Sequence, residues 1–259
     1  MAGPDLGAIH LSIVAPAYNE ADNLEPLVRE IIEAVAPLGP GAPGYEIILV
    51  DDGSTDGSPE VLRALMREVP ALRVLAMERN SGQTAALDAG LRAARGTFVA
   101  TLDADRQNDP AEIPRLLAML EADECDMATG WRARRNDPWL RRVSTKIANG
   151  VRNRLTREKI HDSACGLKVF RRECIARLKL FNGMHRFLPT LVKLEGWRVA
   201  EVPVNHRPRA AGTAKYGVWN RVFKALRDCL AVRWMQRRMI RYRVTEWERD
   251  DVAGTGHQT

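Results

Sequence analysis

Hydrophobic and polar residues follow two kinds of pattern along the first 120 residues. Short apolar runs, typical of buried strands, are separated by stretches in which apolar residues recur every three or four positions, as in helices. The predicted strands are residues 11–15, 47–50, 74–77 and 97–102. The predicted helices are residues 20–36, one opening at Ser58-Pro59 with Ser58 as its cap, 83–94, and one capped by Asp109 that reaches about Leu120. This alternation predicts an α/β fold, a mostly parallel sheet with helices on both faces.

Three polar clusters directly follow three of the predicted strands. They read APAYNE at residues 15–20, DDGSTDG at 51–57 and DADRQ at 103–107. In open α/β sheets ligands bind at the carboxyl ends of the strands, so we expect the clusters to meet at one rim and form a shared site. Taken singly, each cluster also has a simpler interpretation as a turn or helix cap, and Asp109 is better explained as an N-cap than as a ligand.

The third cluster has the composition of a metal site. Asp103, Asp105 and Gln107 supply hard oxygen ligands, which suit Mg²⁺ or Mn²⁺. The chain has no G-x-x-x-x-G-K-[ST] loop and no G-x-G-x-x-G after the first strand, which argues against a Walker-type site and a dinucleotide cofactor. A nucleotide diphosphate held by a metal remains, with Asp51 or Asp52 available to accept a hydrogen bond from a base or ribose.

Charge is divided unevenly along the chain. Residues 1–130 hold 9 Lys and Arg against 22 Asp and Glu, whereas residues 131–243 hold 29 against 7. The acidic half suits a cation, and the basic half is expected to face an anion such as nucleic acid, a phosphorylated small molecule or an anionic membrane. The four cysteines show neither CxxC pairing nor zinc-like spacing, so we expect reduced, structural thiols in a cytosolic compartment.

Four sequence motifs together carry a resemblance to a known family. They are IVAPAYNE, ILVDDGSTDGS, RNSGQTAALDAG and TLDADRQNDPAEIP. The motifs resemble those of family-two inverting glycosyltransferases with the GT-A fold. Their order and spacing are similar to the polyprenyl-phosphate branch, which includes dolichyl-phosphate mannose synthases and bacterial undecaprenyl-phosphate sugar transferases. The resemblance spans about residues 11–216 and implies a GT-A-type sheet in a single domain.

The resemblance implies a role for each matching position. Asp103, Asp105 and Gln107 would hold Mg²⁺ or Mn²⁺, and Asp105 and Arg132 are the expected catalytic residues. The residues expected to bind the nucleotide sugar are Pro16, Tyr18, Glu20, Asp51, Asp52 and Asp103. The residues expected to bind the acceptor phosphate are Arg132, Arg141, Arg209 and Lys215. Guanidinium forks suit the oxygens of a phosphate.

Later segments of the basic half resemble further parts of the family pattern. They are GWRARRNDPWLRRVST (130–145), DSACGLKVFRR (162–172), HRFLP (185–189) and NHRPRAAGTAKYG (205–217). The chain departs from the family pattern at Arg106, Leu167-Lys168 and Ala214, so the identities of the sugar and the acceptor stay open. His185 fits a structural hydrogen bond as well as a sugar contact.

The expected reaction moves a sugar from a UDP- or GDP-linked donor to a polyprenyl phosphate. The acceptor phosphate is anionic near neutral pH and can attack the anomeric carbon with inversion, while the metal stabilises charge on the departing diphosphate. A glycosyltransferase acting on a sugar hydroxyl, in glycan or polysaccharide synthesis, would instead need a base, for which Asp162 is the candidate. A basic nucleic-acid-binding protein without catalysis is the alternative from another class, although we expect no nucleic acid as a partner.

We expect the sequence to divide into four parts. They are an N-terminal extension (1–10), the GT-A glycosyltransferase domain that the resemblance implies (11–217), a basic amphipathic helical segment (218–243) and a polar tail (244–259). The N-terminus lacks a signal-peptide pattern, and no apolar run approaches the roughly 18 to 20 residues of a spanning helix.

The helical segment predicts how the protein reaches a membrane. Apolar residues recur at three- and four-residue spacing over residues 218–235, and residues 139–155 repeat the pattern. The apolar positions of the first segment are Trp219, Val222, Phe223, Leu226, Cys229, Leu230 and Trp234. A core-packing helix and a basic interfacial helix both fit. We therefore expect a cytoplasmic protein that is peripheral at the inner membrane face, with an integral membrane partner or a homo-oligomer as further options.

Overall fold

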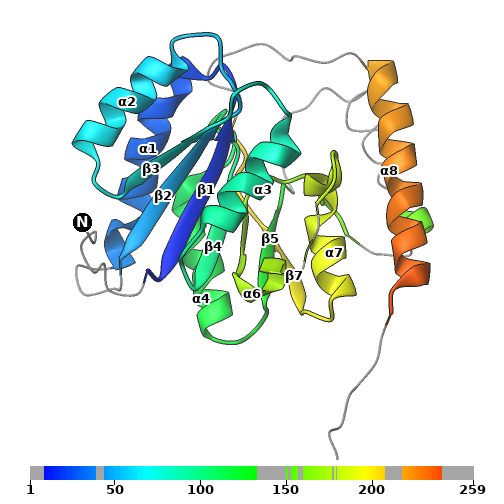
Figure 1. The fold of residues 1–259 in the computed structure, drawn as a ribbon. Coiled ribbons are helices and arrows are strands. Elements are labelled where there is room, and N and C mark those ends of the chain that lie inside the picture. Colours follow the sequence, from blue (N-terminus) through cyan, green and yellow to red (C-terminus); the bar gives the residue numbers. More distant parts are fainter. Residues whose placement is uncertain are drawn as a thin grey trace, which may run out of the picture.

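The computed structural model describes residues 9–38, 44–132, 150, 153–156, 160–176, 178, 180–207 and 218–240. Within these residues seven strands form one sheet, with helices on both faces (Figure 1). The strands are β1 (Leu11–Ala17), β2 (Tyr45–Asp51), β3 (Leu72–Ala76), β4 (Phe98–Thr101), β5 (Met127–Trp131), β6 (Lys168–Arg171) and β7 (Val199–Pro203). The predicted α/β fold with a mostly parallel sheet is confirmed.

The strand order places the predicted site at one edge of the sheet. The order is β3-β2-β1-β4-β6-β5-β7, and β6 alone among these strands runs antiparallel to its neighbours β4 and β5. The carboxyl ends of β1, β2 and β4 therefore meet at the same edge. Because β6 is reversed, its first residue, Lys168, also lies at this edge, paired in register with Thr101 and Thr129.

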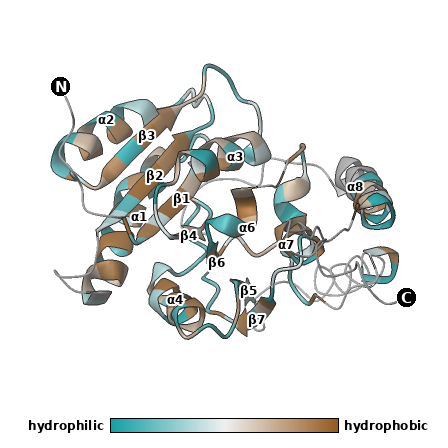
Figure 2. Cartoon of the chain, turned by 60° about the horizontal axis from the view of Figure 1, so that its bottom comes forward, coloured by the Kyte–Doolittle hydropathy of each residue, from teal (hydrophilic) through white to brown (hydrophobic). Residues whose placement is uncertain are grey.

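Two layers of helices cover the sheet, and each buries an apolar side against it (Figure 2). One layer contains α1 (Ala21–Val35), α2 (Ser58–Glu68), the short η2 (Pro110–Glu112) and α4 (Ile113–Glu121). The other contains α3 (Gln83–Ala93), α6 (Glu173–Ala176), η3 (Met184–Phe187) and α7 (Leu188–Leu194). The helix α8 (Val218–Arg238) adds Cys229 and Val232 to the same core. A single turn, η1 (Ala36–Leu38), follows α1.

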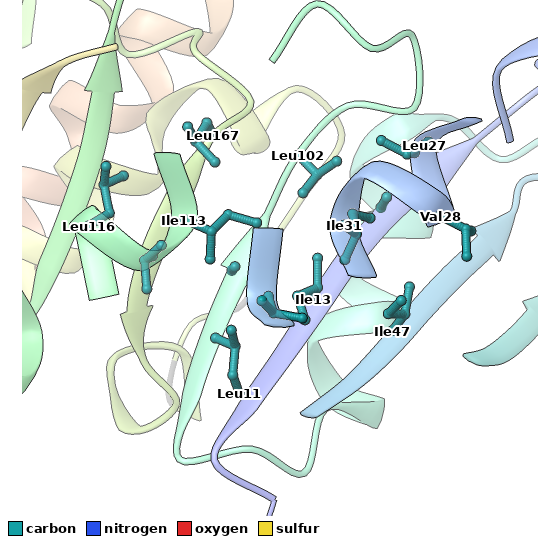
Figure 3. Close-up of a cluster of buried hydrophobic side chains, with 14 of the residues drawn as sticks. Leu11, Ile13, Leu27, Val28, Ile31, Ile47, Leu102, Ile113, Leu116 and Leu167 are labelled. Atoms are coloured by element: carbon teal, nitrogen blue, oxygen red, sulfur yellow. The ribbon is translucent and has the colours of Figure 1, made fainter. Parts of the chain in front are cut away.

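The period-two pattern of the strands supplies both cores. In β1, Ile13 belongs to the cluster under α1 and Val14 to the cluster under α3. Such alternation is expected because successive side chains of a strand point to opposite faces of the sheet. Figure 3 shows Ile13 close to Ile31 of α1 and Ile47 of β2, and all three side chains are fully buried.

Two predicted helix caps had different outcomes. Asp109 accepts a hydrogen bond from the backbone N of Ala111 at 3.1 Å, so its prediction as an N-cap is confirmed. The prediction that Ser58 caps α2 was wrong, because Gly57 holds the cap position. The Ser58 hydroxyl instead accepts a hydrogen bond from the backbone N of Glu20 at 3.1 Å, which ties α2 to the loop after β1.

The predicted C-terminal helix forms α8, which lies beside α7 at the edge of the molecule (Figure 1). The side chains of Trp219, Val222 and Phe223 lie outside the described part of the helix. Cys229 and Val232 are buried in the core, whereas Leu230 and Trp234 are exposed. None of the helices in the described ranges is long and apolar enough to cross a membrane. Residues 139–149, from the second predicted amphipathic segment, lie outside the described residues.

All four cysteines, Cys125, Cys165, Cys174 and Cys229, are free and buried. Their prediction as reduced, structural thiols agrees with this placement.

Candidate active site

The loops after β1 and β2 are joined by side-chain hydrogen bonds. Asn19 has a left-handed backbone with φ of 54°, and its backbone N donates to the hydroxyl of Ser54 at 2.9 Å. Its side-chain oxygen accepts from the backbone N of Thr55 at 2.8 Å. The backbone N of Ala21 donates to Asp56 at 3.3 Å. The first two polar clusters of the sequence therefore form one connected surface at the carboxyl edge.

Asp51 and Asp52, at the end of β2, are both buried but have different partners. Asp51 accepts one hydrogen bond, from the backbone N of Ser54 at 3.0 Å. Asp52 accepts three, from the backbone N of Ser81 at 2.7 Å, the backbone N of Gly82 at 2.9 Å and the Asn80 side chain at 3.1 Å. Asp52 therefore anchors the loop between β3 and α3, and its role as a nucleotide contact stays a prediction.

Gly53 allows the loop between β3 and α3 to lie directly against the chain after β2. Its φ is +67°, and a Cβ at this position would lie 2.5 Å from the backbone C of Arg79 and 2.6 Å from the backbone N of Asn80. A side chain would therefore both strain the backbone and push the loop away. The loop ends at Gln83, the first residue of α3, which reaches the third acidic cluster.

Asp103 and Asp105 follow β4 and are partly exposed at the edge. The Gln83 amide donates to Asp103 Oδ1 at 2.8 Å. A Cβ added to Gly166 would lie only 2.4 Å from Asp103 Oδ2. The chain before β6 therefore passes directly behind this carboxylate. Asp105 Oδ1 accepts from the backbone N of Gln107 at 3.1 Å. The structure thus brings both acids to the same edge as Asp51.

The donor set fits a divalent ion that shares its coordination with a substrate. In the described part of the chain, no three His, Cys, Asp or Glu side chains gather as a self-contained metal site. Two partly exposed carboxylates, Asp103 and Asp105, do stand at the edge where the motif loops meet. Mg²⁺ is commonly bound through one or two carboxylates together with substrate phosphates, so this pair suits such an ion.

Arg132, the predicted catalytic and acceptor residue, forms a two-bond ion pair with Asp162. Its Nε and Nη2 donate to the two carboxylate oxygens at 2.6 and 2.9 Å. Burial alone would lower the pKa of Arg132, but the hydrogen bond and charge of Asp162 raise it above its ordinary value. Because Asp162 is held as the charged partner of a guanidinium, it is poorly suited to be the base of a hydroxyl-acceptor reaction.

Next to this pair lies an aromatic contact. The rings of Trp131 and His161 stack with centroids 4.5 Å apart. His161 Nδ1 lies 3.0 Å from Glu201 Oε2, and the other carboxylate oxygen, Oε1, accepts from the backbone N of Asp162 at 3.1 Å. Glu201 therefore fixes the segment that carries Asp162 against β7.

Lys168, the first residue of β6, is a buried basic residue at the same edge of the sheet. Its side chain is 3% exposed and donates to the backbone O of Cys165. Burial lowers the pKa of Lys168, although the nearby Cys165, Asp103 and Asp162 act in the opposite direction. Together with Arg132, Lys168 places two basic side chains beside the carboxylates of Asp103 and Asp162.

His185 acts as a structural hydrogen-bond partner in this structure. Its Nδ1 lies 2.6 Å from the hydroxyl of Thr84, which also accepts from the backbone N of Gly183 at 2.9 Å. Burial, followed by the charges of Arg186 and Lys168, lowers the pKa of His185 to about 3. The imidazole is therefore neutral across the physiological pH range, and it links η3 to the start of α3.

The remaining predicted residues are placed as follows. Pro16 lies within β1, paired in register with Val50, and Tyr18 is partly exposed. Glu20 accepts a hydrogen bond from the side chain of Asn23 at 2.6 Å. Arg141, Arg209 and Lys215 lie outside the described residues. Gln83 and Lys168 are contacts that sequence reasoning missed. Gln83 lies within RNSGQTAALDAG, a motif to which the resemblance assigns no residue role.

The sheet and its edge define a class of protein. A mostly parallel sheet with helices on both faces, which gathers two acidic clusters at one edge, is the architecture expected of a GT-A-type glycosyltransferase. Residues 12–178 match the family described as Glycosyl transferase family 2, and the chain belongs to this family.

Two curated relatives share the greater part of the chain. It is 40% identical over 234 residues to a dodecaprenyl-phosphate galacturonate synthase of Rhizobium johnstonii, covering 89% of this chain and 68% of that protein. It is 39% identical over 210 residues to an undecaprenyl-phosphate 4-deoxy-4-formamido-L-arabinose transferase of Edwardsiella ictaluri, covering 80% and 63%. The chain thus spans about two thirds of the length of these relatives.

A solved structure shows the same fold at lower identity. It is glucosyl-3-phosphoglycerate synthase from Mycobacterium tuberculosis in complex with Mn²⁺ and uridine-diphosphate-glucose. The two share 20% sequence identity with a TM-score of 0.62, covering 88% of this chain and 79% of that one. At this identity the likeness supports the fold assignment alone.

Proposed function

We propose that the protein transfers a sugar from a nucleotide diphosphate sugar to a polyprenyl phosphate at a membrane surface. The observation that carries the proposal is the similarity, near 40% over at least 80% of the chain, to two relatives named for polyprenyl-phosphate sugar transfer. The edge geometry supports it, because the acidic clusters and the Arg132–Asp162 pair lie at the same end of the sheet.

Asp103, Asp105 and Gln107 would hold Mg²⁺ or Mn²⁺, which when bound stabilises negative charge on the donor diphosphate. Asp51 has one carboxylate oxygen engaged by Ser54, so it is the better placed of the β2 pair to accept from the nucleoside. The fixed loops after β1 and β2 would orient the donor without rearranging, which favours transfer by preorganisation.

Arg132 would bind the acceptor phosphate through the edge of its guanidinium that Asp162 leaves open. The ion pair uses Nε and Nη2, so the Nη1 side is available for a second anion. Asp162 then serves to fix the plane of the fork, and the anionic phosphate itself attacks the sugar. A separate general base is therefore not required.

The direct test uses purified protein, a panel of UDP- and GDP-linked sugars, polyprenyl phosphate and Mn²⁺, with mass spectrometry of the lipid product. We expect a polyprenyl-phosphate sugar, and no product without the lipid. Transfer to a sugar hydroxyl, or salt-dependent binding of DNA without any transfer, would replace the proposal by one of its two alternatives.

A matched pair of variants separates acceptor binding from general damage. Arg132→Lys keeps the charge but loses the fork, so the KM for polyprenyl phosphate should rise about ten- to a hundredfold, whereas the donor affinity stays unchanged. Arg198→Lys is the control, because Arg198 makes a similar two-bond pair with Asp126 elsewhere on the surface. An equal loss of donor affinity in Arg132→Lys would assign Arg132 to the donor instead.

We also propose that α8 contacts an anionic membrane. Leu226, Leu230 and Trp234, spaced four residues apart, are 42%, 54% and 65% exposed, and Arg227, Arg237 and Arg238 are exposed nearby. A helix with exposed apolar residues and surrounding arginines suits the interface of an anionic bilayer.

Vesicle sedimentation tests the contact. Wild-type protein should bind anionic vesicles at low salt and be released at high salt, and Leu230→Ser with Trp234→Ser should remain in the supernatant while staying folded. Because these two side chains are exposed, their replacement should leave the unfolding midpoint nearly unchanged. Binding that is insensitive to lipid charge and to both replacements would contradict the proposal.

A further inference from the structure

Four charged side chains of alternating sign join the loop that carries Asp105 to α1 and to the segment after β7. Glu30 of α1 binds Arg106 through Oε1 at 2.5 Å and Arg207 through Oε2 at 2.8 Å. Arg207 also donates to Asp109 Oδ1 at 2.8 Å. We call Arg106, Glu30, Arg207 and Asp109 the Glu30 network. It connects α1, the loop after β4 and the segment after β7.

Arg106 stands between two predicted metal ligands in an unusual conformation. Its φ is 60°, a left-handed backbone that is sterically unfavourable for a residue with a Cβ. Its Nε is buried and finds no hydrogen-bond partner among the described residues. These two costs require a compensating contact, and the partly buried ion pair with Glu30 supplies one, since the two side chains are 26% and 22% exposed.

Arg207 holds the same loop from its other end. Its backbone N donates to the backbone O of Gln107 at 3.0 Å, in addition to its side-chain bonds. The carboxylate of Asp109 has a further task, because it caps η2 through the backbone N of Ala111. The loop from Asp103 to Asp109 is thus fixed on both sides, and Glu30 is the acceptor that both arginines share.

We propose that Glu30 is a positioning residue for the transfer reaction. By binding Arg106 and Arg207 together, it keeps Arg106 in the left-handed conformation and so sets the direction in which Asp105 and Gln107 face the metal and the donor diphosphate. The proposal rests on the proposed metal site at Asp103 and Asp105. It adds that the geometry of that site is set from α1, outside the ligand set.

The test compares Mn²⁺ binding in the presence of a nucleoside diphosphate, measured by calorimetry on the full chain. Glu30→Gln keeps the side-chain size but removes the charge, so its affinity for Mn²⁺ should fall about tenfold. Glu25→Gln is the matched control, because Glu25 lies on the same helix, is 61% exposed and pairs only loosely with Arg29 at 3.6 Å. The control should bind Mn²⁺ as tightly as wild type.

A rescue variant shows whether backbone conformation is the cause. Glycine adopts positive φ without strain, so adding Arg106→Gly to Glu30→Gln should recover much of the lost Mn²⁺ affinity. If Glu30→Gln lowers the unfolding midpoint but binds Mn²⁺ normally, Glu30 is merely structural and the proposal fails. It also fails if the glycine gives no recovery. Wild-type protein that binds neither Mn²⁺ nor Mg²⁺ would instead refute the metal site itself.

Discussion

Asp51-Asp52 at the end of β2 and Asp103-x-Asp105 at the end of β4 give nearly the same signal in the sequence, closely spaced carboxylates after a buried strand. In the structure they differ in burial and in partners. Asp51 and Asp52 are 5% and 2% exposed, whereas both acids after β4 are partly exposed. Asp52 receives three hydrogen bonds from the loop at residues 80–82.

The difference shows how one edge combines a rigid part with a reactive part. A buried carboxylate that receives several hydrogen bonds stabilises the fold and has little capacity left for a ligand. Carboxylates that keep some exposure can bind an ion supplied with the substrate. The two ends are also linked, since the loop anchored by Asp52 leads into Gln83, which binds Asp103. Position at the carboxyl edge therefore does not by itself assign a catalytic role.

The largest expected effect is on catalysis at the β4 end. Asp105→Asn removes a charge that would hold the metal, so the transfer rate at saturating donor should fall by at least about a hundredfold. Its free energy of unfolding should change little, because the side chain is partly exposed. Steady-state kinetics and urea denaturation measure the two quantities. Full activity of the variant would show that the acids after β4 are no more reactive than those after β2.

At the β2 end the larger effect should be on stability. Asp52→Asn replaces an acceptor of three hydrogen bonds by an amide whose NH₂ faces N–H donors, so the free energy of unfolding should drop by about 2 kcal/mol. Asp51→Asn, where a single bond from Ser54 is affected, should cost less. Equal losses in urea denaturation would show that hydrogen-bond number does not distinguish these two acids.

Much of the first half could be predicted from the sequence. Runs such as IILV and FVATL are continuous and apolar, as strands covered on both faces must be, and their order places the three motif loops at one edge. The strands β5, β6 and β7 were not identified individually. Each has four or five residues and carries polar members, such as Thr129, Lys168 and Glu201, so the apolar signal is weak.

The partners of the site residues could not be predicted, because they depend on tertiary placement. Arg132 and Asp162 are 30 positions apart, and nothing in their local sequence indicates that each is the partner of the other. Similarly, DDGSTDG shows two acids, but it does not show that the loop at Asn80 takes up the second. Residue types at strand ends predict a site, whereas the division of labour within it needs the fold.

A third prediction concerns the pH dependence of stability at the start of α3, the helix that follows the loop anchored by Asp52. His185, bonded to Thr84 next to Gln83, has a folded-state pKa of about 3, below the ordinary 6.5. As pH falls below 6.5, the unfolded chain takes up the proton first, so acid favours unfolding. The loss of stability should approach about 1.4 kcal/mol per pH unit and continue toward the folded-state pKa.

Urea denaturation between pH 7 and pH 5 covers the range in which histidines titrate, since most carboxylates titrate at lower pH, and variants then assign the effect to one histidine. His185→Asn keeps an acceptor for the Thr84 hydroxyl and should flatten the pH dependence. His161→Asn is the control, because that side chain is 61% exposed. An unchanged slope in His185→Asn would show that other groups cause the acid sensitivity.

The smallest expected effect comes from the contact that joins the two ends directly. Gln83→Met keeps the side-chain length but removes the hydrogen bond to Asp103 Oδ1, so Asp103 loses orientation without losing charge. We expect kcat/KM to fall about fivefold, equivalent to about 1 kcal/mol, because the bond is exposed to solvent and therefore weaker than a buried bond to a carboxylate. Gln236→Met on α8, which removes the hydrogen bond from the Gln236 side chain to the backbone O of Thr156, should leave kcat/KM unchanged. If Gln83→Met lowered stability as much as Asp52→Asn while kcat/KM stayed the same, Gln83 would belong to the rigid part of the edge, and the boundary between the two parts would have to be drawn at Asp103 itself.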